Sequence, residues 1–127
     1  MRRHLSPSQL RPPFGRYHHA VGIERPQALL VVSGQLGLRP DGSVPEDPAE
    51  QAAAAFAAID ACLAEAGFSR ADVLRLSAFI TEPEYREPYM RVRDTWVADP
   101  PPASTLVIVK ALALPACKVE IEATAGR

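Results

Sequence analysis

Two glutamates near the C-terminus are the residues best placed to do chemistry. They belong to the stretch Lys118-Val119-Glu120-Ile121-Glu122-Ala123-Thr124-Ala125. On a β-strand, alternation would place both glutamates on one face with Lys118 and Thr124, opposite the apolar residues. Carboxylates two residues apart on a strand lie about 7 Å from each other. In a cleft that excludes water, such a pair suits general acid and base roles. A solvated sheet face is the alternative interpretation of the same pattern.

The other reactive residue types form no recognisable motif. His18 and His19 are adjacent, and neighbours on a strand point to opposite faces, so they are not expected to bind one metal ion. Cys62 and Cys117 lack the spacing of a zinc site or a disulfide framework. Ser33 is followed by Gly34 and Gln35 and does not sit in a G-x-S-x-G elbow. We therefore expect no metal site.

A β-sheet must position the glutamates, and the hydrophobic pattern predicts one. Alternating or continuous apolar runs indicate strands at residues 17–21, 28–33, 73–81, 105–110 and 118–125. A helix is expected between the second and third of these strands, and another between the third and fourth. This order predicts an α+β fold in which both helices lie on one side of a mixed sheet.

The first helix is marked by its capping residues. Asp47 is predicted to be the N-cap, Pro48 to occupy the first helical position and Glu50 to complete a capping box. Gly67 suits the C-terminal cap of a helix that ends near residue 66. In the second helix, one face carries mainly aromatic residues, namely Tyr85, Tyr89, Val92 and Trp96. Packing is the simpler interpretation of that face than ligand binding.

Length and charge limit the function classes. The chain has 127 residues and 21 of its apolar residues are alanine, so we expect one domain with a modest core that oligomer contacts would complete. Residues 1–14 contain three prolines and are expected to form an extended or poorly ordered arm before a single domain at 15–127. The net charge of −1 argues against a nucleic-acid partner. Absence of a long apolar run or secretory signal indicates a cytoplasmic protein that does not bind membranes.

Several short stretches, in order and at compatible spacing, resemble the RidA family, also called the YjgF or reactive-intermediate deaminase family. The similarity runs from about residue 15 to 125, and its matching stretches are Gly15-Arg16-Tyr17-His18-His19-Ala20-Val21, Val32-Ser33-Gly34-Gln35-Leu36, Asp41-Gly42, Ala64-Glu65-Ala66-Gly67, Pro101-Pro102-Ala103-Ser104-Thr105 and Val119-Glu120-Ile121-Glu122-Ala123.

This resemblance implies a fold and an activity. The implied fold is a chorismate-mutase-like α+β subunit of a homotrimer, with ligand clefts between neighbouring subunits. The implied activity is hydrolysis of reactive enamine and imine metabolites to a 2-oxo acid and ammonia, without a metal or organic cofactor. A trimer that only binds a small metabolite is the alternative. RNA cleavage, an older label for the family, fits the balanced charge least well.

The resemblance also assigns site residues. Glu120 corresponds to the glutamate that helps to activate water, and Tyr17 and Gly34 correspond to residues that line the cleft. The arginine that clamps the substrate carboxylate in the deaminases falls on Ala103, which is followed by Ser104 and Thr105 in the same substrate-binding stretch. Since a methyl group cannot bind a carboxylate, the activity of this chain is left open. Arg16, next to Tyr17, is a candidate to supply the missing cation.

Overall fold

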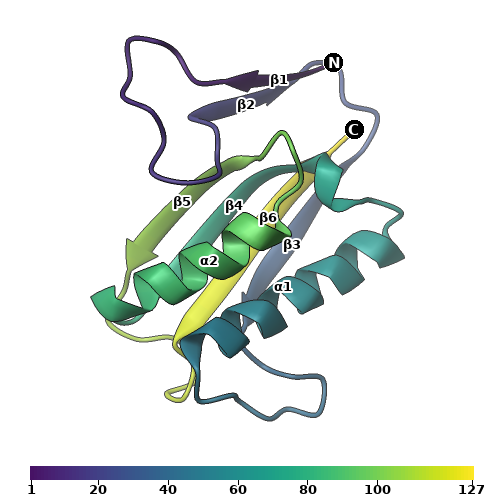
Figure 1. The fold of residues 1–127 in the computed structure, drawn as a ribbon. Coiled ribbons are helices and arrows are strands. Elements are labelled where there is room, and N and C mark those ends of the chain that lie inside the picture. Colours follow the sequence, from purple (N-terminus) through teal and green to yellow (C-terminus); the bar gives the residue numbers. More distant parts are fainter.

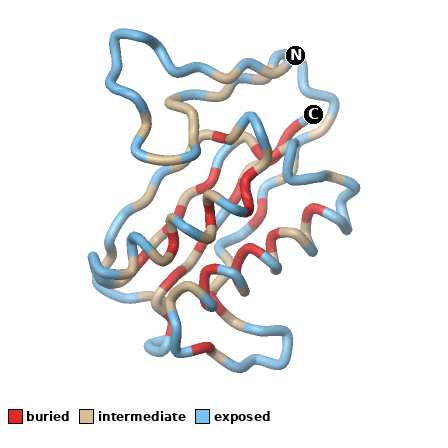
Figure 2. Tube along the Cα trace, viewed as in Figure 1, coloured by how far each residue is buried: buried red, intermediate tan, exposed pale blue.

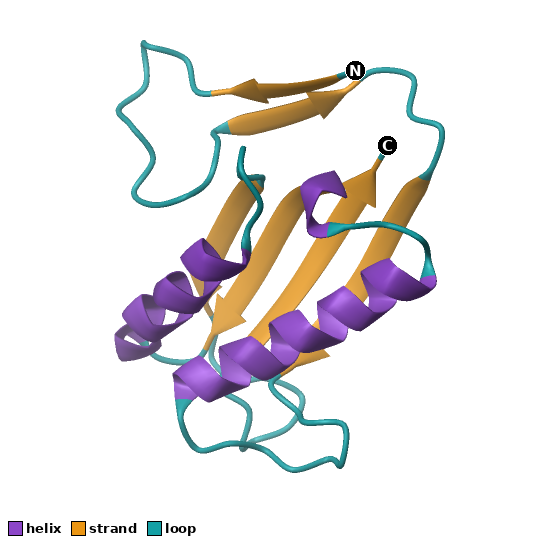
Figure 3. Ribbon diagram, turned by 45° about the vertical axis from the view of Figure 1, so that its right-hand side comes forward, coloured by secondary structure: helices purple, strands orange, loops and turns teal.

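A four-stranded mixed sheet forms the centre of the molecule. The computed structural model describes residues 1–127. The strand order is β3 (Leu29–Leu36), β6 (Val119–Gly126), β4 (Val73–Ile80) and β5 (Ala103–Ile108). Strand β6 is antiparallel to both neighbours, whereas β5 is parallel to β4. Both helices, α1 (Pro48–Glu65) and α2 (Arg86–Trp96), cover the same face of this sheet (Figures 1 and 3). The predicted α+β architecture is confirmed.

Helix α1 begins and ends where its capping residues predict. The Asp47 carboxylate accepts a hydrogen bond from the Ala49 N–H at 2.9 Å, and Gly67 follows the helix with a φ of +74°, which glycine adopts without strain. The expected capping box is not formed. The Glu50 carboxylate instead lies 3.9 Å from the guanidinium of Arg39.

Helix α2 is preceded by a short 3-10 turn, Pro83–Tyr85. Pro88 lies within the first helical turn, where its missing N–H costs no hydrogen bond because N–H groups there have no intrahelical acceptor. The predicted aromatic face does pack: Tyr89 and Trp96 are buried, and their rings stack against Phe56 of α1 at centroid distances of 6.1 and 4.6 Å. These ring contacts form the packing between α1 and α2.

The N-terminal residues form a second, two-stranded sheet. Strand β1 (Arg2–Leu5) pairs antiparallel with β2 (Ala20–Ile23), so the strand expected at 17–21 begins later and lies outside the main sheet (Figure 1). The Arg2 guanidinium anchors β1 to the rest of the chain through the carbonyl oxygens of Ala71 and Gly126. Within the stretch 1–14, for which we expected an extended or poorly ordered arm, residues 2–5 are therefore a paired strand.

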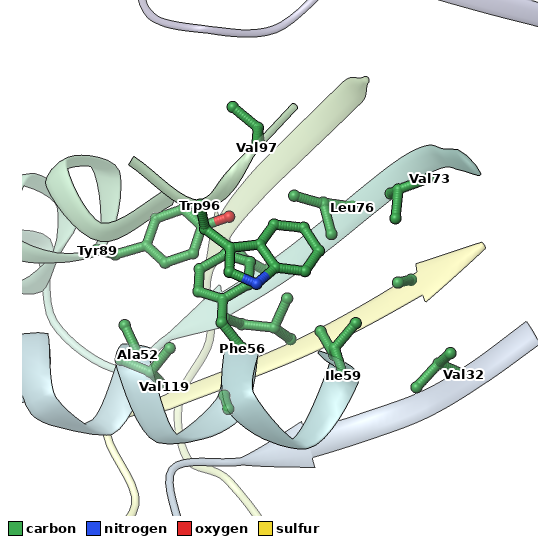
Figure 4. Packing of buried hydrophobic residues seen from close by; sticks show 14 of the residues in the cluster. Val32, Ala52, Phe56, Ile59, Val73, Leu76, Tyr89, Trp96, Val97 and Val119 are labelled. Carbon is green, nitrogen blue, oxygen red and sulfur yellow. The ribbon is translucent and has the colours of Figure 1, made fainter. Parts of the chain in front are cut away.

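The core lies between the helices and the main sheet. Figure 2 shows the buried residues concentrated where these two layers face each other. Figure 4 shows the rings of Phe56 and Trp96 against each other, with Ile59 of α1 and Leu76 of β4 in the same cluster. The apolar side of β6, predicted from its alternation, is fully buried at Val119 and Ile121. The opposite face of the sheet carries no helix, and we refer to it as the open face.

Exposed apolar side chains mark the open face. Leu29 and Val31 of β3 are 60% and 76% exposed, and Val107 of β5 is 41% exposed. Register places Val31 level with Thr124, and Val107 level with Phe79, on the side away from the helices. Large apolar side chains on a sheet face are usually covered by another surface.

Candidate functional site

Glu120 lies beside a glycine in a bulge of the neighbouring strand β3. Pairing between β3 and β6 is irregular between Val32 and Gln35, and Gly34 falls inside this bulge. A Cβ on Gly34 would overlap the Glu120 carboxylate and would lie 2.9 Å from its Cδ atom. The missing side chain at Gly34 therefore makes the space that the Glu120 carboxylate fills. The structure brings together these two predicted site residues.

A buried glutamine fixes the segment that leads into Glu120. Gln51 of α1 is fully buried. Its amide N–H groups donate to the carbonyl oxygens of Pro45 and Ala116 at 2.9 and 3.1 Å, and its Oε1 accepts from the Lys118 N–H at 2.7 Å. Because Lys118 stands two residues before Glu120, this side chain sets where strand β6 begins. The sequence pattern did not identify Gln51, since an isolated polar residue in an alanine-rich helix gives no local signal.

The thiol of Cys117 is buried, which makes it a poor candidate for a nucleophile. Burial raises the pKa of the Cys117 thiol, and the negative charge of Glu120 raises it further. The thiol therefore stays protonated near neutral pH. The carboxylates of Glu120 and Glu122 are therefore the candidates for chemistry at this end of β6.

A pocket of about 370 Å³ opens beside Glu120 on the open face. Gly34, Glu120 and Glu122 contribute its polar part, and its apolar part consists of Phe79, Val109, Ala111, Leu112 and Ala113. Glu120 is partly buried while Glu122 is exposed, so the two carboxylates meet different degrees of solvation. The pocket is open to solvent, so water can reach the Glu120 carboxylate.

Ala103 and Thr105 lie on the same open face but far from Glu120. Ala103 is level with Arg75 of β4, whereas Glu120 is level with Phe79, four residues further along that strand. With one strand in between, the Cα atoms of Ala103 and Glu120 are about 16 Å apart. One small ligand cannot touch both residues within a single chain.

Tyr17 and Ser104 line a different pocket, which lies between β5 and α2 on the helix side. This cavity of about 270 Å³ is lined by Phe14, Tyr17, Ile80, Arg86, Met90, Arg93, Ser104, Leu106 and Ile108, and we refer to it as the α2 pocket. Ser104 follows Ala103 on strand β5, so strand alternation sends its side chain to the opposite face from Ala103 and Thr105. The predicted site residues are thus divided between two pockets of the chain.

Arg93 is a functional candidate that the sequence pattern did not reveal. Its side chain is only 3% exposed, yet it contributes to the lining of the α2 pocket. Its guanidinium lies 5.4 Å from the ring centre of Tyr17. The available signal was its position, four residues after Tyr89 and three before Trp96 on the packed face of the helix. An arginine on such a face is buried only when its charge has partners.

Arg16 does not reach either pocket. Its guanidinium donates to the carbonyl oxygens of Asp94 and Ala98 at 2.9 and 3.5 Å, and it lies 3.7 Å from the Asp99 carboxylate. These contacts hold the segment before β2 on the C-terminal end of α2, where unpaired carbonyl groups favour a cation. The structure therefore does not place Arg16 with Tyr17 as a second cation in the cleft.

The adjacent histidines have separate structural partners. A ring nitrogen of His18 lies 2.7 Å from the Pro101 carbonyl oxygen, and one of His19 lies 2.8 Å from that of Arg11. No group of three or more histidine, cysteine, aspartate or glutamate side chains is arranged to hold a metal ion. Neither α1 nor α2 has the length and apolar content needed to cross a bilayer.

A family model and two curated relatives match most of this sequence. Residues 8–126 match the family model described as endoribonuclease L-PSP. A RutC family protein of Aquifex aeolicus is 34% identical over 116 residues, which cover 89% of this chain and 90% of that protein. The RutC family protein YjgH of Escherichia coli is 39% identical over 95 residues, or 70% of this chain and 72% of the relative.

Solved structures with the same fold include two proteins named as Rid family or RidA. The Rid family protein YyfB of Yersinia pestis superposes with a TM-score of 0.87 at 30% identity, covering 99% of this chain and 98% of the other. RidA from an Antarctic Psychrobacter species superposes with a TM-score of 0.74 at 27% identity, covering 98% of this chain and 99% of the other. The similarity extends over the whole sheet and both helices.

Proposed function

This chain belongs to the RidA (YjgF) family, and from that membership we propose that it hydrolyses reactive enamine or imine metabolites, with Glu120 as the group that activates water. The observation that carries the proposal is the fit of the Glu120 carboxylate into the gap at Gly34. This fit holds a carboxylate at the mouth of a pocket that water can enter. A general base must be held in this way to reach the proton that it removes.

The chemistry needs one acid–base residue and one water molecule. A proton from solvent adds to the enamine carbon and another leaves the nitrogen for solvent, which gives the imine. The Glu120 carboxylate then accepts a proton from water while the water oxygen bonds to the imine carbon. Glu120 passes this proton to the nitrogen. As the carbon–nitrogen bond breaks, the hydroxyl proton of the addition product also moves to the nitrogen, so the products are a carbonyl compound and ammonia. No oxidant or reductant is consumed.

A homotrimer would complete the site. Within one chain, Glu120 and Gly34 lie on the open face, whereas Tyr17 and Ser104 line the α2 pocket at the edge strand β5. Packing the open face of one subunit beside the β5 edge of the next would bring these two sets of residues to one cleft. The exposed Leu29 and Val31 support burial of that face.

Ala103 favours a second candidate function, a trimer that binds a small metabolite without converting it. Its methyl group offers no hydrogen bond to a substrate carboxylate, and the open face near it has only Arg75 as a cation. RNA cleavage has less support, because Glu120 and Glu122 are both acidic on this face and would repel a phosphate backbone.

The test is a substrate-decay assay with matched variants. A dehydratase generates 2-aminoacrylate, and its decay is followed with and without this protein. Hydrolysis should fall by about two to four orders of magnitude in Glu120→Gln, because general-base catalysis is typically worth that much. Glu65→Gln, a matched change at an exposed carboxylate of α1 outside the pocket, should keep the activity. Equal loss in both variants would contradict the role given to Glu120.

A gain-of-function variant separates the two candidate functions. If the remaining site is intact, Ala103→Arg should raise the rate for a carboxylate-bearing imine. If wild type and Ala103→Arg both leave decay at the uncatalysed rate while each binds a small acid, the metabolite-binding trimer becomes the better description.

A further inference from the structure

The α2 pocket has the composition of a site for an anion with an apolar body. Of its nine lining residues, two are arginines and none is acidic. Its walls are mainly apolar, with Ile80, Met90, Leu106 and Ile108 among them. Pockets that combine apolar walls with a few fixed polar groups are typical small-molecule sites.

Arg93 is held rigidly at this pocket. Its Nε and Nη2 atoms both donate to Asp94 Oδ1 at 3.0 Å, and Nη1 donates to Ser104 Oγ at 3.4 Å. The rings of Tyr17 and Tyr89 lie 5.4 and 5.7 Å from its central carbon. A guanidinium fixed on several sides loses little freedom when it binds a ligand.

Two donor groups of Arg93 remain free. A guanidinium has five N–H groups, and the three hydrogen bonds above use three of them. Of the remaining two, one belongs to Nη1 and one to Nη2, and Gly15 packs close to Nη2. Next to Arg93, the Tyr89 hydroxyl is buried and also has no hydrogen-bond partner. Arg93, which lines the pocket, therefore has unused hydrogen-bonding capacity, and so does Tyr89 behind it.

We propose that Arg93 binds the carboxylate of the substrate, so that helix α2 supplies the cation that Ala103 does not supply from strand β5. The apolar wall then receives the side chain of the substrate, and the substrate class is a 2-imino acid with a branched aliphatic or aromatic side chain. This inference rests on the proposed function, because it assigns the α2 pocket to the same cleft as Glu120.

The neighbouring residues explain why Arg93 remains available. Asp94 is 33% exposed and lies outside the lining of the pocket, so it orients the guanidinium without being part of the pocket wall. Arg86, also on α2, lines the same pocket and lies 5.9 Å from the Phe14 ring. A second cation in the lining favours approach of a negatively charged ligand.

A binding experiment with the wild-type protein tests this inference directly. The probes are 4-methyl-2-oxopentanoate, which is the hydrolysis product of a branched substrate, and the corresponding 2-oxo amide, which has no charge. Titration calorimetry should show at least about tenfold tighter binding of the acid than of the amide. Pyruvate, with its single methyl group, should bind more weakly than the branched acid because it leaves the apolar wall uncovered.

Variants then identify the residue responsible. Arg93→Met should remove the preference for the acid over the amide, and Arg93→Lys should restore part of it. Arg91→Met, an exposed arginine on the same helix, is the matched control and should retain the preference. An unchanged preference in Arg93→Met would overturn the inference. If that variant does not fold, equal affinity of the wild type for acid and amide would overturn it instead.

The outcomes separate this inference from the proposed function. If hydrolysis depends on Glu120 but the affinity for the acid does not depend on Arg93, the proposed function stands and the inference fails. If the acid binds through Arg93 but no imine is hydrolysed, the carboxylate site stands and the proposed function fails.

Discussion

Replacing Gly34 by alanine tests how closely the Glu120 carboxylate must be held. The new Cβ would lie 2.9 Å from Cδ and 3.2 Å from Cγ of Glu120, distances that side-chain atoms do not tolerate without movement. Glu120 is only partly buried, so its side chain can rotate away from the strand. The backbone of the β3 bulge does not need to move.

The expected effect is large on activity and small on stability. A rotamer displaced by some 30° costs about 0.5 to 1.5 kcal/mol, so the free energy of unfolding should fall by no more than about 2 kcal/mol. Displacing a catalytic group by about 1 Å costs on the order of a hundredfold in rate. Gly34→Ala should therefore lower kcat/KM for enamine hydrolysis about a hundredfold.

The assay combines substrate decay with thermal unfolding, and a second glycine provides the control. Gly22 lies in strand β2, and a Cβ added there would meet no other atom within 4 Å, so Gly22→Ala should leave both properties near wild type. Activity of Gly34→Ala within about twofold of the wild type would refute the reasoning, because Glu120 would then not need its position. A loss of stability above about 3 kcal/mol would show that the side chain cannot move aside.

Three further changes test the surroundings of the site. Gln51→Leu leaves three backbone groups without their buried partner and should cost about 3 kcal/mol in urea unfolding; a loss below about 1 kcal/mol would contradict its role in fixing β6. Asp60→Ala removes the carboxylate that accepts hydrogen bonds from the Trp96 indole N–H and from Arg70. We expect the free energy of unfolding to fall by about 1 to 3 kcal/mol, measured by the fluorescence of the single tryptophan during unfolding. Unchanged stability would contradict this role of Asp60. Burial raises the pKa of Tyr89 in the folded protein to about 12, whereas a tyrosine in the unfolded chain has a pKa of about 10. Between these values the unfolded chain loses the hydroxyl proton and the folded protein keeps it, so stability should be lost as pH rises from about 10 to 12. Tyr89→Phe should remove this part of the pH dependence in denaturant titrations, and an identical pH profile would count against it.

Local signals in the sequence predicted the helices and the strand that carries Glu120. Asp47 and Gly67 mark the ends of α1 because capping depends on residues within one turn of the helix end. Alternation predicted which face of β6 is buried, since a strand needs only its own sequence to define two faces. Glu50 shows the limit of this approach: a long-range partner, Arg39, replaced the local hydrogen bond.

Contacts between distant residues account for what the sequence did not reveal. Strand β1 is held by the hydrogen bonds of Arg2 to Ala71 and Gly126, far away in the chain. Arg93 is a site candidate only because β5 and the segment around Tyr17 meet α2. Only its position beside Tyr17 in the sequence suggested Arg16 as a second cation, but the two adjacent side chains diverge, and Arg16 binds the end of α2 instead.

The decay of 2-aminoacrylate in the presence of the wild-type protein and Glu120→Gln tests the central claim most directly. Ammonia release is measured alongside, because hydrolysis yields one ammonia for each 2-oxo acid. We predict faster decay than in buffer with the wild type, and a return to nearly the uncatalysed rate with a folded Glu120→Gln. Decay at the uncatalysed rate with the wild type, or undiminished catalysis by Glu120→Gln, would contradict the account.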